Sequence, residues 1–180
     1  EKYKHFPPAA IRDEHGRSLL SWRVAILPWI EERELFDQFH LNEPWDSPHN
    51  LKLATQMPEV FKDPAFNESV REHRTTYVVP VGAGTAFDSD TGIALREIVD
   101  GTSKTVMIVE VPPENAVIWT KPEDWEVDME NPRQGFVRTD RDYIVIAACD
   151  GAVHIWPTDI KPEVLRAHLT RAGREVVDWP

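Results

Sequence analysis

The carboxylates of residues 88–92 offer the clearest candidate chemistry in this 180-residue chain. Asp88 and Asp90 alternate with two hydroxyl residues and are followed by Gly92, and oxygen-rich loops of this kind bind calcium. The loop is not an EF-hand, because the position that would carry the closing bidentate glutamate is Val99. Two other interpretations stay open: a plain hairpin turn, and a pair of carboxylates that act together in a hydrolytic active site.

A second run of acids lies between residues 120 and 135, where Pro122 and Pro132 also occur. Polar residues and prolines over such a length indicate a long surface loop with solvated carboxylates. The acids of this run are Glu123, Asp124, Glu126, Asp128 and Glu130.

Cys149 is the single cysteine, so it cannot form an intramolecular disulfide. It ends an apolar run that starts at Ile144, which predicts a small buried hydrophobic residue. A nucleophilic thiol would need a neighbouring base, and His154 is the one base nearby in the sequence.

The histidines are scattered singly through different predicted elements. A metal site needs three or four convergent ligands, so we expect surface or helix-cap positions and no metal. The seven residues are His5, His15, His40, His49, His73, His154 and His168.

Seven tryptophans are many for this length. Trp22, Trp29 and Trp156 lie on apolar faces and are expected in the core. Trp45 and Trp125 lie in polar segments, so they are the candidates for an exposed platform that binds a glycan or a partner.

The chain contains no G-x-S-x-G elbow, no phosphate-binding glycine loop, no H-E-x-x-H and no paired cysteines. A formal net charge of -11 argues against binding to a nucleic-acid backbone. The length and a hydrophobic fraction of 41% predict one globular domain over residues 1–180 with its own core. No apolar stretch has transmembrane length and no signal peptide is recognisable, so we expect a soluble fragment. We expect no catalysis and no cofactor.

Helical spacing predicts a helix over residues 21–39, with Ser21 as N-cap and a bend at Pro28. A short helix is expected from Ser47 to about Ala54.

β-branched and aromatic runs predict the strands. Asp150 and Gly151 are expected as a two-residue type I′ hairpin turn. A last helix should begin at Pro162, run through Leu169 and have Gly173 at its C′ position. This order indicates an α+β fold, in which a mainly antiparallel sheet packs with N-terminal helices and one C-terminal helix. The expected strands cover residues 75–79, 93–99, 105–111, 117–119, 143–149 and 152–156.

Several strings, taken together, resemble the planctomycete prepilin-like proteins, a domain-of-unknown-function family with an H-X9-DG motif. The resemblance runs from about residue 6 to residue 175. It is carried by residues 6–10, 20–31, 35–36, 39–41, 43–50, 75–77, 100–105, 119–124 and 150–151.

The resemblance implies a pilin-like or pseudopilin-like head domain that lies outside the cytoplasmic membrane, in the cell envelope or secreted. Family members begin with a prepilin signal and one long hydrophobic helix, which would precede Glu1. Other envelope or pilus-like subunits are the implied partners, the missing helix would be the membrane contact, and the isolated head is expected to be a monomer. The family has no established activity.

This chain departs from the family pattern at three places. The histidine of the motif falls at Asp140, so the motif here is D-X9-DG. A cysteine common before a Ser-Asp-Pro string is missing near residues 60–64, and the asparagine of the D-G-T-S-N-T string is Lys104. A role of those residues in relatives therefore does not carry over unchanged.

Three functions are compatible with these observations. A structural or assembly module is favoured by the family strings and by the missing catalytic motifs. A binding module for a solute, glycan or calcium is suggested by Trp45, Trp125 and the acid loops. A hydrolase that uses Asp88 and Asp90 is the third.

Overall fold

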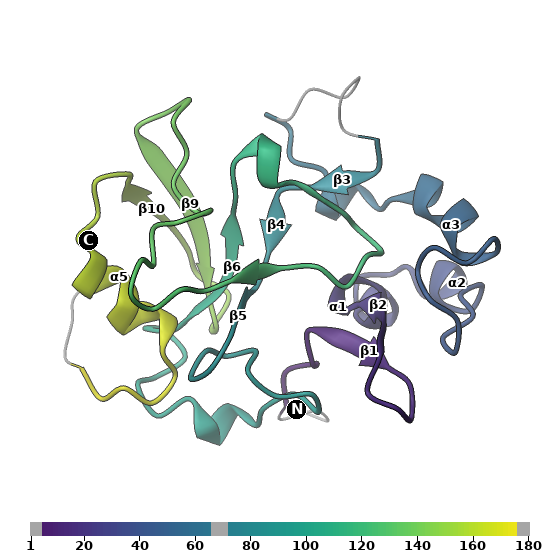
Figure 1. Ribbon diagram of the computed structural model, residues 1–180, viewed down its shortest axis with the longest axis horizontal. Helices are drawn as coiled ribbons and strands as arrows, with labels where there is room; N and C mark the ends of the chain where they lie inside the picture. Colours follow the sequence, from purple (N-terminus) through teal and green to yellow (C-terminus); the bar gives the residue numbers. More distant parts are fainter. Residues whose placement is uncertain (1–4, 66–71, 176–180) are drawn as a thin grey trace.

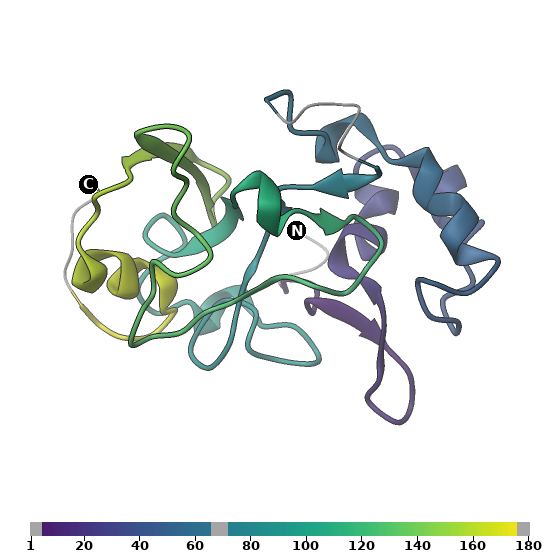
Figure 2. The same ribbon diagram turned by 45° about the horizontal axis from the view of Figure 1, so that its top comes forward.

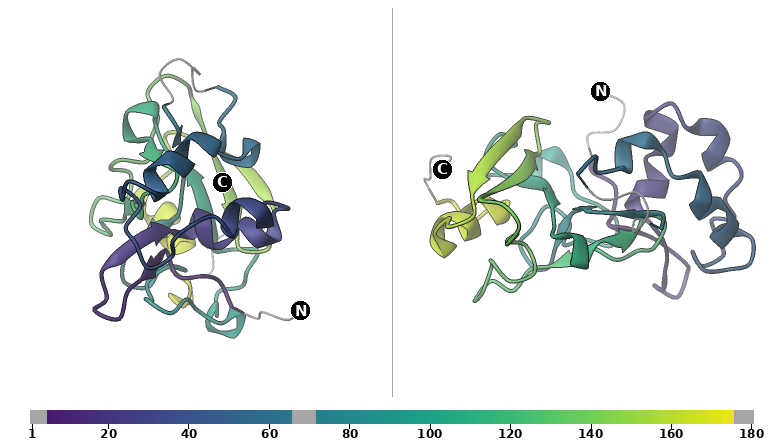
Figure 3. Two further views of the ribbon diagram at one scale, coloured as in Figure 1. Left: turned by 90° about the vertical axis from the view of Figure 1, so that its right-hand side faces the viewer. Right: turned by 90° about the horizontal axis from the view of Figure 1, so that it is seen from above.

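The computed structural model describes residues 5–65 and 72–175. Short helices gather at one end, and the hairpin β9–β10 and helix α5 lie at the other end (Figure 1). Figure 3 shows the same separation from above, with sheet strands running between the two ends. The mixed helices and antiparallel strand pairs agree with the predicted α+β class.

The central sheet has four antiparallel strands in the order β10-β9-β6-β4. The runs rich in β-branched residues form these strands because such side chains pack well on a pleated, half-buried surface. The predictions for these four segments are therefore confirmed. The strands are β4 (Tyr77–Val78), β6 (Val106–Glu110), β9 (Tyr143–Ala148) and β10 (Val153–Pro157).

Residues 74–81 contain three two-residue strands. Besides β4, which pairs with β6, they hold two further two-residue strands. β3 (Arg74–Thr75) pairs antiparallel with β7 (Val117–Ile118). β5 (Pro80–Val81) pairs in parallel with β8 (Trp125–Glu126). The prediction of a plain surface loop over residues 120–135 is wrong at this point, because β8 pairs with β5.

The N-terminal segment begins with a hairpin that sequence reasoning missed, β1 (Ala10–Arg12) and β2 (Ser18–Ser21). Ser21 is the predicted N-cap, and its hydroxyl accepts a hydrogen bond from the Arg23 N–H.

The predicted helix over residues 21–39 is instead three short pieces. Proline lacks an N–H, and Glu31 has a left-handed φ of 66°, so the helical hydrogen bonds stop twice. The pieces are α1 (Trp22–Ala25), the 3₁₀ turn η1 (Leu27–Trp29) and α2 (Arg33–Phe36).

The next helix begins later than predicted. α3 spans Asn50–Leu53 and continues as η2 (Ala54–Gln56), while the Ser47 hydroxyl accepts the Asn50 N–H at 3.1 Å. A further 3₁₀ turn, η3 (Glu59–Phe61), follows.

The extended segment predicted over residues 93–99 is wrong. It contains the 3₁₀ turn η4 (Leu95–Glu97), because the Glu97 carboxylate accepts the Ala94 N–H at 2.7 Å and closes a turn. Another 3₁₀ turn, η5 (Pro113–Asn115), precedes β7.

Helix α5 (Pro162–Leu169) has the predicted proline in its first turn. The predicted C′ glycine is wrong, because Thr170 is already extended with ψ 145°. Gly173 lies beyond the helix, where its N–H donates to the Asp100 carboxylate at 2.7 Å.

The turn between β9 and β10 is a hairpin, but not of type I′. Gly151 alone of the two central residues has a positive φ, 89°. The Gly151 N–H donates to the Ala148 carbonyl, and the Ala148 N–H donates to the Ala152 carbonyl. This is a three-residue loop with a glycine bulge, the next commonest hairpin connection.

Two apolar clusters form the core. The first joins the N-terminal elements to Trp119 and Cys149. The second lies between the sheet and α5, and contains Ile144, Trp156 and Leu165. Among the described residues, no helix has the length and apolar character needed to cross a membrane.

Candidate functional site

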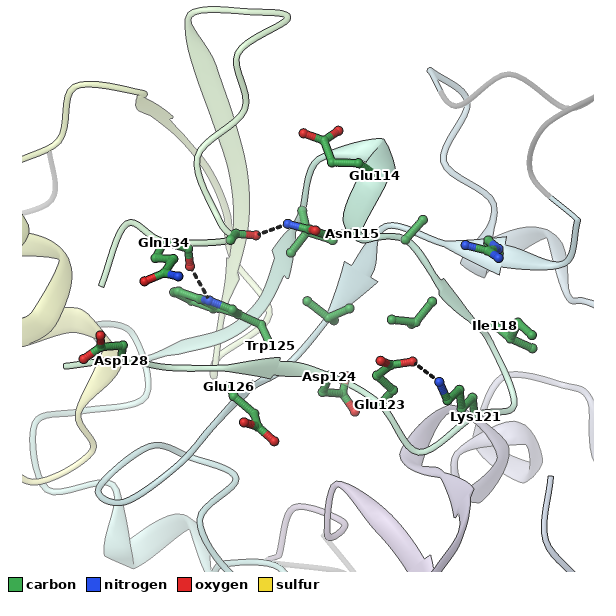
Figure 4. A pocket seen from close by; sticks show the side chains of 16 residues that line it. Glu114, Asn115, Ile118, Lys121, Glu123, Asp124, Trp125, Glu126, Asp128 and Gln134 are labelled. Atoms are coloured by element: carbon green, nitrogen blue, oxygen red, sulfur yellow. Dashed lines mark hydrogen bonds and ion pairs between the residues drawn. The ribbon is translucent and has the colours of Figure 1, made fainter. Parts of the chain in front are cut away.

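A groove of about 740 Å³ lies between two arms of the segment that contains β7 and β8. One arm carries Asn115 and Ile118, and the chain then turns and returns with Glu123 and Trp125 (Figure 4). The apolar residues of its lining are all buried except Ile118: Val78, Val111, Ala116, Val117 and Trp125.

The polar lining of the groove carries both signs of charge. Lys121 pairs with Glu123 at 2.6 Å, and Arg74 is the other basic residue of the lining. No serine, threonine, cysteine or histidine lines it, so its described residues offer no activated nucleophile of those types. An apolar floor with a polar rim suits a partly polar organic ligand. The remaining polar lining residues are Glu114, Asn115, Asp124, Glu126, Asp128 and Gln134.

Trp125 is not the exposed platform that its polar neighbours suggested. Its ring stacks on Phe136 with centroids 4.8 Å apart, and its indole N–H donates to the Gln134 carbonyl at 2.9 Å. The Asn115 amide donates to the Gly135 carbonyl at 2.9 Å. These bonds fix the end of the groove, and the ring is buried beneath it.

Asp124 lies under the groove rather than in solvent, which corrects the prediction for the acid run. Its Oδ1 accepts from the Arg23 guanidinium at 2.8 Å, the Val79 N–H at 3.0 Å and the Trp22 indole at 3.1 Å. The Arg23 and Asp124 side chains are 0% and 4% exposed. Burial raises the pKa of Asp124 and lowers that of Arg23, and the attraction between the two charges opposes both shifts.

A second charged cluster centres on the Arg138 guanidinium. It donates to both oxygens of Asp140, at 2.9 and 2.6 Å, and to Glu110 at 2.8 Å. Arg141 reaches the other Glu110 oxygen at 2.7 Å. Burial raises the pKa of Glu110, while the hydrogen bond from Arg138 holds the pKa of Asp140 at about 2.

Two acidic residues from distant parts of the sequence meet in this cluster. Asp140 is the first residue of D-X9-DG. Asp63, from the string near residues 60–64, has its carboxylate 3.9 Å from Arg138 and accepts the Thr76 hydroxyl at 3.0 Å. Paired and hydrogen-bonded carboxylates of this kind tie chain segments together.

The structure does not bring Asp88 and Asp90 into one site. The Asp88 carboxylate pairs with Arg171 and accepts the Gly84 N–H, whereas Asp90 pairs with Arg12 at 3.0 Å. Within residues 5–65 and 72–175, no group of three or more histidines, cysteines, aspartates or glutamates could hold a metal ion. The calcium and paired-carboxylate interpretations therefore lose their geometric basis.

Two histidine predictions need correction. The rings of His40 and His49 stack at 3.6 Å, so these residues are not isolated from each other. His40 also contacts the Glu43 carboxylate at 3.0 Å. His168 is fully buried, and its Nδ1 lies 2.7 Å from the Lys104 carbonyl.

The other tryptophan and cysteine predictions have mixed outcomes. Trp22 and Trp156 are buried as expected, but Trp29 is 64% exposed. Trp45 is half-buried, with the Lys121 ammonium 5.7 Å from its ring centroid. Cys149 is buried as predicted, and burial raises its pKa to about 12.

Sequence reasoning missed the groove and the Arg138 cluster. The groove depends on two short arms whose two-residue strands carry no periodic signal. Arg138 and Glu110 are 28 positions apart, and only the folded sheet reveals that they are neighbours.

A family model described as "Protein of unknown function (DUF1559)" matches residues 1–82. The match supports similarity to a domain-of-unknown-function family over this N-terminal part. No curated protein and no solved structure matches the chain.

Proposed function

We propose that this chain is a non-catalytic assembly module, the head domain of a pilin-like or pseudopilin-like protein outside the cytoplasmic membrane. The observation that carries the proposal is the outer hairpin face, defined as the solvent side of β9 and β10. Its six side chains carry no formal charge, on a chain whose formal net charge is -11, and the Arg141 guanidinium lies 4.4 Å from the centroid of the Tyr143 ring. Exposed apolar patches of this kind mark interaction surfaces. Its members are Tyr143, Val145, Ala147, Val153, Ile155 and Pro157.

The charged groups support the same proposal. The buried charges of Arg23, Asp124, Arg138 and Glu110 are all engaged in ion pairs inside the fold. These ion pairs tie segments of the fold together. The match of residues 1–82 to a family of unknown function is compatible with an assembly role.

The test is chemical crosslinking in the native cell, followed by fractionation of the envelope. We expect crosslinked multimers that contain this chain, in the envelope or secreted fraction. A chain that stays uncrosslinked and fractionates with cytoplasmic proteins would overturn the proposal.

A binding module is the second candidate, and the groove of about 740 Å³ is the observation that favours it. Thermal unfolding with a panel of glycans and amino compounds tests it, because a ligand that binds the folded state raises the midpoint. Asn115→Ala should abolish any such rise, whereas the exposed control Gln38→Ala, on the far helical end, should not. A flat panel removes this candidate.

A further inference from the structure

The hairpin β9–β10 has one covered face and one open face. On the covered face, Ile144, Ile146 and Trp156 pack in the cluster that includes α5. On the open face, Val153 and Ile155 are 67% and 68% exposed. Figure 2 shows α5 on one side of the hairpin, which projects from the rest of the fold. The open face is therefore a large apolar surface at one end of the molecule.

β10 is also the last strand of the sheet order, so its outer edge pairs with no other strand among the described residues. The pairing pattern tells which backbone groups face outward. Ala148 bonds to Ala152, and the Thr158 N–H bonds to the Asp142 carbonyl. Hydrogen-bonded pairs alternate with non-bonded pairs in an antiparallel ladder. The N–H and C=O groups of Val153 and Ile155 therefore point away from β9.

We propose that two copies of this chain pair through the outer edges of their β10 strands, antiparallel about a two-fold axis. The proposal rests on the assembly role above and names the partner as a second copy. It joins two four-stranded sheets into one continuous sheet of eight strands and makes the two outer hairpin faces continuous. The sequence predicts a monomeric head, and the exposed edge is the observation that favours a dimer instead.

The backbone defines one register. If Val153 lies opposite the partner's Ile155, every outward N–H and C=O of both residues gains a partner, and the axis passes through His154. A register centred on Ile155 would place Pro157 opposite Val153. Proline has no N–H, so the Val153 carbonyl would then lack a donor. The first register is therefore favoured.

The net charge of the chain restricts where a second copy can bind. Two chains of net charge -11 repel each other at long range, so they can meet closely only where the contact itself is uncharged. The six members of the outer hairpin face carry no formal charge. Salt screens the remaining repulsion, so the dimer should tighten as ionic strength rises. A basic partner on this acidic chain would show the opposite salt dependence.

The contact is small. Stable interfaces bury roughly 1,200–2,000 Å² in total, and the edge offered here is a strand of only five residues. The dimer should therefore be concentration-dependent. Sedimentation velocity of the 180-residue chain across a wide dilution series measures it.

The matched substitutions are Ile155→Arg and, as control, Val60→Arg, since Val60 is 59% exposed and lies in η3 among the helical elements at the other end of the molecule. Ile155→Arg should raise the dissociation constant about tenfold or more, because it places a cation on the edge strand of each copy. Val60→Arg should leave it unchanged. Circular dichroism of both variants shows whether each is folded.

Cysteine pairs test the register. In an antiparallel hydrogen-bonded pair the Cα atoms are about 5.5 Å apart, which suits a disulfide. A mixture of Val153→Cys and Ile155→Cys chains should form a mixed disulfide dimer on mild oxidation, and each variant alone should form much less. Cys149 does not compete, because it is buried and its pKa is raised to about 12.

The possible results distinguish a failure of the edge pairing from a failure of the proposed assembly role. A chain that stays monomeric at high concentration, with no mixed disulfide, overturns the edge pairing. If such a chain still forms multimers in the native cell, the assembly role stands through another surface. Self-association that Ile155→Arg leaves unchanged also overturns the edge pairing.

Discussion

Replacing Asp124 by asparagine should be among the most damaging single polar changes in this fold. The substitution keeps the size of the side chain and one oxygen, but it removes the charge that faces Arg23 at 2.8 Å. The guanidinium is 0% exposed, so water cannot replace the lost carboxylate. An uncompensated buried charge costs several kcal/mol.

The expected loss of stability can be estimated from buried ion pairs in other proteins. Removing one partner of such a pair lowers the free energy of unfolding by about 3–5 kcal/mol. For a chain of this size each kcal/mol lowers the melting temperature by about 2–4 °C. We therefore expect Asp124→Asn to melt about 6–20 °C below the parent. Urea unfolding followed by tryptophan fluorescence measures the change, since Trp22 donates to the same carboxylate.

A double-mutant cycle isolates the pair. Arg23→Met combined with Asp124→Asn removes both charges. The double variant should therefore lose less stability than the sum of the losses of the two single variants. The exposed pair Arg33 and Asp37 is the control, with side chains 68% and 56% exposed. Arg33→Met and Asp37→Asn should each change stability by less than about 1 kcal/mol. A loss of similarly small size for Asp124→Asn, with an additive cycle, would refute the reasoning.

Three further predictions follow from single sites. Gly92→Ala should destabilise by about 1–3 kcal/mol more than Gly16→Ala in urea unfolding, because the two glycines have similar φ values of 75° and 79° but, of the two, only residue 92 would bring a Cβ against a backbone oxygen, that of Phe6; equal losses would contradict this. Cys149 should react with a thiol reagent at pH 8 only as fast as the chain opens, since its pKa is about 12; rapid labelling of the folded protein would show an accessible thiol. Arg138 lowers the pKa of Asp140 from 3.8 to about 2, so this contribution to stability is present above about pH 4 and disappears as pH falls to 2. Asp140→Asn should therefore differ from the parent at neutral pH and converge with it near pH 2 in urea midpoints, whereas a constant difference would exclude this linkage.

The sequence predicts the sheet strands well, because runs such as residues 143–149 are long and rich in β-branched side chains. The sequence does not predict the positions at which a single residue adopts an unusual backbone conformation. Glu31 takes a left-handed φ and ends a helical pattern that its neighbours would continue. The connection at Gly151 is a three-residue loop and not a two-residue type I′ turn, and an Asp-Gly pair alone does not distinguish the two.

The candidate site is harder to predict than the fold. Acidic residues in a polar run are expected to be exposed to solvent. Glu126 is exposed, but the Asp124 side chain is buried because it pairs with Arg23, which is far away in the sequence. Likewise, the residues next to Trp125 in the sequence are polar, but in the fold its ring stacks on Phe136. Long-range partners of this kind leave no periodic pattern in one sequence.

The ion pair between Arg23 and Asp124 also joins the part of the chain that the family model matches to the part that it does not match. The family model ends at residue 82, but the counter-ion of Arg23 lies 101 positions further along the chain, and Trp119 donates its indole N–H to the Ala54 carbonyl. A chimera that joins residues 1–82 to a different C-terminal half would carry a buried cation without its anion. While Arg23 is kept, changes in the later sequence must leave a carboxylate within reach of its guanidinium, so residues outside the matched part are constrained by a residue inside it.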